Sequence, residues 1–121
     1  MSPLLVYPDP PPPELAQSLD LAGFSWKAVA NSAIADQKSI DQEWGGAVIV
    51  ADEDPNDAFS FARFLRKKSN PQQGILILLN ATQLGQLELR DELFDDFILT
   101  PFRHQELEAR LKHLFWSQGV D

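Results

Sequence analysis

The sequence contains no cysteine, so it can form neither a disulfide framework nor a thiolate zinc site. It has two histidines, His104 and His113, which fall on roughly opposite sides of the predicted last helix and therefore do not form a paired metal site. No Ser-His-Asp arrangement and no glycine-rich phosphate loop is visible. From these absences we expect no enzymatic activity, no bound metal and no cofactor.

Long apolar runs and basic residues are also scarce. No run approaches the roughly 20 apolar residues of a membrane-spanning helix, and the N-terminus lacks the features of a secretory signal. Together with the missing cysteines, this predicts a protein of the reducing cytoplasm with no membrane partner. Ten Lys and Arg against 18 Asp and Glu give a net charge of −8, which repels a phosphate backbone. DNA binding would therefore need a domain outside this chain.

Short apolar runs alternate five times with amphipathic segments along the 121 residues, a length that fits one domain. Strands are predicted at Leu4–Tyr7, Phe24–Val29, Ala47–Ala51, Ile75–Leu79 and Phe97–Leu99. Helices are predicted from Pro13 to a cap at Gly23, over Ser32–Glu43, from Asp54-Pro55 to Lys68, around Leu84–Leu89, and over Arg103–Trp116. Because the strands are almost continuously apolar, this alternation predicts a five-stranded parallel sheet with helices on both faces.

The segment DDFILTPFRHQELEARLKHL, from Asp95 to Leu114, resembles the last strand and helix of response-regulator receiver domains, most of all the OmpR/PhoB type. An acidic pair and an aromatic lead into a short strand, followed by a Pro-Phe pair and a helix with Glu-Leu and Ala-Arg. The resemblance implies a (βα)5, flavodoxin-like receiver domain over residues 1–121. It also implies a regulatory role in a two-component system, as the N-terminal part of a longer regulator.

The resemblance also assigns the positions that carry phosphoryl transfer in receivers, and most are replaced here. The family proline that follows the acceptor aligns with Pro55, which puts Ala51 at the acceptor position. The replaced positions are Pro8 in the acidic pair, where Asp9 survives, Ala51 at the acceptor, Asn80 at the hydroxyl and Thr100 at the lysine. Alanine has no oxygen nucleophile and threonine no positive charge, so the resemblance predicts a degenerate, phosphorylation-independent receiver.

One alternative is a phosphoacceptor that uses Asp52 with Mg²⁺. A one-residue shift of the third strand would bring Asp52 to the acceptor position, with Asp9 and Asp54 nearby as metal ligands. Such a shift moves every side chain of a buried strand to the opposite face, which disfavours it. Without the shift, Asp52 to Asp54 are loop and helix-capping acids.

The resemblance carries further expectations about the C-terminal part. Phe97 matches a switch aromatic, for which we expect simple packing, and the Thr100-Pro101 bond is expected to be cis. OmpR/PhoB-type receivers form homodimers through helix 4, strand 5 and helix 5, where this chain carries charges at Arg90, Asp91, Asp95, Asp96, Glu106 and Arg110. We expect Asp96 to meet Arg110 across a two-fold axis, although Glu106 and Arg110 also suit an intrahelical pair.

These expectations combine into one functional hypothesis. The chain is predicted to be a phosphorylation-independent dimerisation domain of an OmpR/PhoB-type transcription regulator. A phosphoacceptor using Asp52 and a stand-alone adaptor that binds another protein remain the alternatives.

Overall fold

The computed structural model describes residues 3–30, 45–51, 55–68, 74–89 and 94–116. Several predictions lie outside this described part: the helix over Ser32–Glu43, the alternative acceptor Asp52 with its neighbour Asp54, and the charged residues Arg90 and Asp91.

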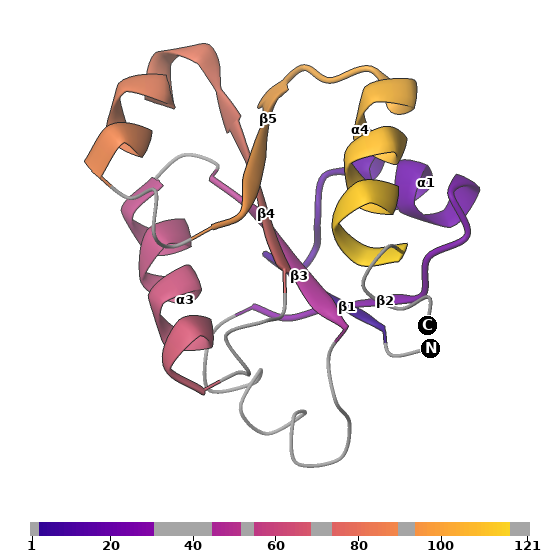
Figure 1. Ribbon diagram of the computed structural model, residues 1–121, viewed down its shortest axis with the longest axis horizontal. Coiled ribbons are helices and arrows are strands. Elements are labelled where there is room, and N and C mark those ends of the chain that lie inside the picture. Colours follow the sequence, from indigo (N-terminus) through magenta and orange to yellow (C-terminus); the bar gives the residue numbers. More distant parts are fainter. Residues whose placement is uncertain (1–2, 31–44, 52–54, 69–73, 90–93, 117–121) are drawn as a thin grey trace.

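The centre of the fold is a five-stranded parallel sheet with the strand order β2-β1-β3-β4-β5 (Figure 1). Its strands are β1 (Leu4–Tyr7), β2 (Trp26–Ala28), β3 (Gly46–Val50), β4 (Gly74–Asn80) and β5 (Asp96–Thr100). Every residue of β3 is buried, as expected for a central strand that is covered on both faces. The predicted parallel (βα)5 architecture is confirmed.

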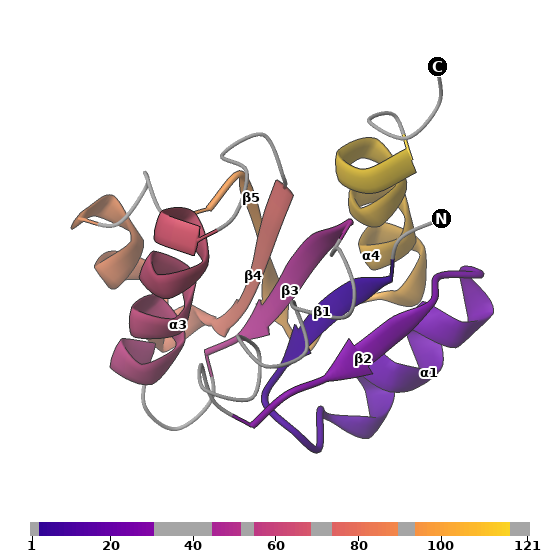
Figure 2. The same cartoon turned by 90° about the horizontal axis from the view of Figure 1, so that it is seen from below.

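Helices cover both faces of the sheet (Figure 2). The described helical elements are α1 (Pro13–Leu21), α3 (Pro55–Lys68), the 3₁₀ helix η1 (Ala81–Leu89), α4 (His104–Leu111) and the π-helical turn η3 (Lys112–Trp116). On one face, α3 buries Ala58, Phe61 and Leu65 against alternate residues of β3 and β4. On the other, Leu15 of α1 and Leu107 of α4 pack together against the remaining strand residues. The alternation of side chains along buried strands therefore produces two separate cores.

The end of α1 shows how sequence sets local structure. Gly23 has a φ of +83°, which glycine adopts at little cost. The amide of Gly23 donates to Asp20 O at 3.1 Å, and that of Phe24 donates to Leu19 O at 3.1 Å. These two bonds form a Schellman motif, with Phe24 and Leu19 both buried in the same core. The predicted cap at Gly23 is confirmed.

Three predicted elements differ from those observed. The strand expected over Phe24–Val29 is limited to Trp26–Ala28, because Phe24 serves the helix cap. The ragged segment around Leu84 forms a 3₁₀ helix, and the last helix changes at Lys112 from α to π geometry. Within the described residues, no helix is long and apolar enough to cross a membrane.

Candidate functional site

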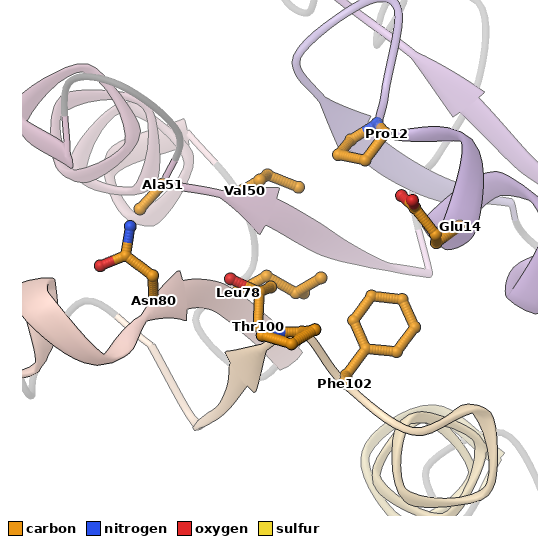
Figure 3. A pocket seen from close by; sticks show the side chains of 9 residues that line it. Pro12, Glu14, Val50, Ala51, Leu78, Asn80, Thr100 and Phe102 are labelled. Carbon is orange, nitrogen blue, oxygen red and sulfur yellow. The ribbon is translucent and has the colours of Figure 1, made fainter.

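A cavity of about 320 Å³ lies at the carboxyl ends of the central strands (Figure 3). In open parallel α/β sheets, ligands bind beyond the carboxyl ends of the strands, so this is where a site is expected. The β1–α1 segment, the ends of β3, β4 and β5, and the segment after β5 all contribute. Its lining residues are Pro12, Glu14, Val50, Ala51, Leu78, Asn80, Thr100, Pro101 and Phe102.

Ala51 occupies the end of the central strand and is 4% exposed. Its amide donates to Leu78 O at 2.7 Å, so the ladder between β3 and β4 continues one residue beyond Val50. Its side chain packs with the core beneath α3 and also lines the cavity. The buried end of β3 therefore presents a methyl group to the cavity.

Asn80 closes β4 and begins η1. Its side-chain Oδ1 accepts from the backbone N–H of Gln83 at 3.1 Å and from the Thr82 hydroxyl. In return, Gln83 Oε1 accepts from the backbone N–H of Asn80 at 3.0 Å. This reciprocal pattern caps the start of a helix. Because Oδ1 makes these bonds, the side-chain nitrogen of Asn80 points toward Ala51 (Figure 3).

The remaining walls come from both sides of the sheet's end. Thr100 ends β5, and the Thr100-Pro101 bond is cis, as the resemblance implied. Phe102, Pro12 and Glu14 line the side of the cavity that lies away from Ala51 and Asn80 (Figure 3). The structure thus brings together Ala51, Asn80 and Thr100, three of the residues assigned from the resemblance. It adds Glu14, which belongs to no motif, and Phe102, which was matched to the Pro-Phe pair but not predicted to line a site. The positions of both depend on how two loops meet.

The described residues do not fit a magnesium site. Pro8 and Asp9 follow β1, where Asp9 is exposed and neither residue lines the cavity. The chemistry of Mg²⁺ calls for carboxylates that converge with other oxygen ligands. No group of three His, Cys, Asp or Glu side chains that could hold a metal occurs within the described ranges. Asp52 and its acidic neighbours fall outside those ranges.

Four of the charges predicted for a dimer face lie in the described part of the chain, and all four are paired within the chain: Asp95, Asp96, Glu106 and Arg110. Arg110 Nη1 donates to both carboxylate oxygens of Asp96, at 2.9 and 3.0 Å, and Nη2 donates to Glu106 Oε2 at 3.2 Å. Partial burial lowers the pKa of Arg110, but the hydrogen bonds and negative charges of Asp96 and Glu106 outweigh it and raise the pKa overall. The guanidinium therefore stays charged at any physiological pH.

Asp95, the first residue of the acidic pair, has a different role from Asp96. Its Oδ2 accepts from the amide of Ile75 at 2.8 Å and from Arg66 Nη2 at 2.9 Å. The Asp95 amide in turn donates to Ile75 O at 2.9 Å. Asp95 therefore fastens the start of β5 to β4 and to the end of α3, an interaction the sequence analysis did not anticipate.

Phe97 on β5 is half-buried and packs against the core beneath α3. Its ring meets Phe94 edge-on, with a centroid distance of 6.5 Å and an interplanar angle of 86°. This geometry agrees with the packing role expected for Phe97.

Solved structures with a similar fold include receiver domains. The receiver domain of the TMAO respiratory system response regulator TorR superposes with a TM-score of 0.78 at 18% identity, over 97% of this chain and 98% of that one. The receiver domain of a sensor histidine kinase from Pseudomonas aeruginosa PAO1, which holds a magnesium ion in its active-site cleft, gives 0.75 at 21% identity, over 95% and 98%. A receiver domain protein from Clostridium thermocellum gives 0.78 at 14% identity, over 98% of both chains.

No family model and no curated protein matches the sequence. At these identities, the structural likeness establishes the fold. The chain has the five-stranded receiver fold, and its function has to be argued from its own residues.

Proposed function

We propose that this chain is a regulatory receiver-like domain that works without aspartyl phosphorylation. It belongs to a DNA-binding transcription regulator of the OmpR/PhoB type, whose DNA-binding domain lies outside this chain. The proposal rests on the receiver fold together with a replaced phosphoacceptor site.

The observation that carries the proposal is Ala51. This residue lies at the buried end of β3, beside Asn80 and Thr100, in a cavity at the carboxyl ends of the strands. A methyl group cannot attack a phosphoryl donor. The described residues that line the cavity include no Lys or Arg to balance the charge of a phosphorylated aspartate. A carboxylate at another position that accepted a phosphoryl group would therefore have no nearby positive charge to stabilise the product.

The direct test is incubation with acetyl phosphate and Mg²⁺, followed by measurement of the intact mass. We expect no adduct with the mass of one phosphoryl group, under conditions that label an ordinary receiver domain run in parallel. A stable adduct on the unaltered protein would contradict the proposal.

The alternative acceptor, Asp52, is favoured by one observation: it directly follows Ala51, the residue at the end of β3. Against it stands the hydrogen bond from the Ala51 amide to Leu78 O, which fixes the register of the strand up to that point. If an adduct forms, Asp52→Ala identifies its position. Loss of the adduct in Asp52→Ala but not in Asp9→Ala would assign the acceptor to Asp52.

Regulation without phosphorylation requires another means of assembly, for which we propose a homodimer through η1, β5 and α4. Two exposed leucines support this face: Leu84 on η1 is 39% exposed and Leu99 on the edge strand β5 is 36% exposed. The nearby cluster of Asp96, Arg110 and Glu106 is closed within one chain. In the proposed dimer this cluster lies at the edge of the apolar contact made by the leucines. Charges at the rim of an interface usually set how the two chains align.

A further inference from the structure

The cavity at the ends of β3, β4 and β5 is hollow for reasons that trace to single residues. Ala51 contributes only a methyl group, and Asn80 keeps its amide close to that methyl group because its oxygen caps η1. Glu14 lies on one side of the lining and Asn80 on the other (Figure 3). At about 320 Å³, the cavity matches the lower range of pockets that bind small organic molecules.

The lining of this cavity has a distinct charge character. Val50, Leu78 and Phe102 supply apolar surface, and Glu14 is the one charged side chain among the described residues of the lining. Those described residues include no Lys, Arg or His. The adjoining start of α1 also has fewer of the amide donors that make many helix ends attractive to anions, because Pro12 and Pro13 have no N–H group. The site therefore disfavours an anion.

The same groups suit an organic cation. The carboxylate of Glu14 and the ring of Phe102 lie on the same side of the cavity, and both attract a positive charge (Figure 3). Val50 and Leu78 lie between that side and Asn80, whose amide nitrogen is a hydrogen-bond donor. We propose that this cavity binds a small organic cation, an amine whose apolar body lies over Val50 and Leu78 and whose charged end meets Glu14.

Binding of such a ligand could regulate a domain that is not regulated by phosphorylation. This regulatory use rests on the proposed function, whereas binding itself requires only the cavity. The phosphorylation assay and the binding assay below can therefore fail separately.

The test uses three probes of similar shape and different charge: benzylamine, benzyl alcohol and benzoate. Each is titrated into the ¹⁵N-labelled protein while amide resonances are followed by NMR. We expect saturable shifts with benzylamine at Ala51, Leu78, Asn80, Thr100 and Phe102. Benzyl alcohol should bind more weakly at the same amides, and benzoate should not bind.

The variant Glu14→Gln removes the charge and keeps the shape. We expect it to weaken benzylamine binding about three- to fivefold, the range for a partly solvated ion pair, and to leave benzyl alcohol unaffected. Retained binding of the alcohol also shows that the variant is folded. Asp57→Asn is the matched control, because Asp57 is likewise an exposed acid in a first helical turn but does not line the cavity.

Three results would each overturn the proposal. The first is the absence of benzylamine shifts at these amides, and the second is benzoate binding as tight as that of benzylamine. The third is a Glu14→Gln variant that binds benzylamine as well as the unaltered protein does.

Discussion

At the scale of single residues, Asp95 shows how an acidic residue that resembles part of a family motif can have a structural role of its own. One of its oxygens accepts from both a partly buried backbone amide of β4 and a guanidinium of α3. Asp96, its neighbour, faces α4 and binds Arg110 instead. Adjacent residues of a strand point to opposite faces, so the pair fastens β5 to the helices on both sides of the sheet.

We expect Asp95→Ala to lower the free energy of unfolding by about 1–2 kcal/mol, because the Ile75 amide loses its acceptor. The value stays modest since the Asp95 side chain is 41% exposed and its ion pair is screened. Asp95→Asn should cost less, because the amide oxygen can still accept from Ile75. Urea unfolding measures both variants, and an unchanged midpoint in Asp95→Ala would contradict this role.

At the scale of secondary-structure elements, the close approach of η3 to the sheet depends on Gly46. The ring of Phe115 lies directly over this glycine, so that an added Cβ would overlap the ring, with 2.6 Å to Cδ1. The ring is itself held by an edge contact with Phe24, at a centroid distance of 6.4 Å. η3 therefore packs against β3 only because β3 begins with glycine.

Gly46→Ala should accordingly lower the free energy of unfolding by about 1–3 kcal/mol, the usual cost of overpacking a core. Gly85→Ala is the matched control, since a Cβ at Gly85 meets nothing within 4 Å. That control should leave stability unchanged or raise it by up to about 1 kcal/mol. Thermal or urea unfolding distinguishes the two, and equal effects would show that the Phe115 contact is unimportant.

Most of the elements were predictable because apolar periodicity reports directly on burial. The strand Leu4–Tyr7 was predicted with its observed bounds, and the stripe Ala58, Phe61 and Leu65 is buried as expected. Periodicity does not distinguish 3₁₀ or π geometry from α-helix, so helices were predicted in both places but the geometry of η1 and η3 was not. It also overextended the second strand, where local capping by Phe24 outweighs strand preference.

The candidate site was predictable in part. Ala51, Asn80 and Thr100 follow strands of one parallel sheet, so the fold alone brings them to one edge. Glu14 and Phe102 come from segments whose positions depend on how α1 and α4 pack on the sheet, which no local pattern encodes. The pairing of Arg110 with Asp96 inside one chain was likewise missed, because sequence alone does not tell a contact within a chain from one across a two-fold axis.

At the scale of the whole molecule, the proposed dimer can be tested with a variant of its face, and the internal charge cluster decides which residue to change. Arg110→Ala would disturb the fold of a single chain as well as an interface. Leu99→Asp is cleaner, because this leucine is exposed on the edge strand. We expect Leu99→Asp to shift sedimentation-velocity profiles from dimer to monomer.

The control for the dimer prediction is Leu21→Asp. Leu21 is 67% exposed and lies at the end of α1, which is not one of the elements of the proposed face. It should leave the dimer unchanged. A protein that sediments as a monomer at every concentration, or equal effects of both variants, would contradict the proposed face.

The strand order also has a consequence for how the chain folds during synthesis. β1 lies between β2 and β3, and β3 in turn lies between β1 and β4. β1 therefore leaves the ribosome well before its inner neighbour Gly46–Val50, and can pair only with the short β2 in the meantime. Such non-local pairing slows folding, since a long loop must close before the contact forms. The apolar first strand is thus the segment most in need of protection on the nascent chain, until β3 has emerged.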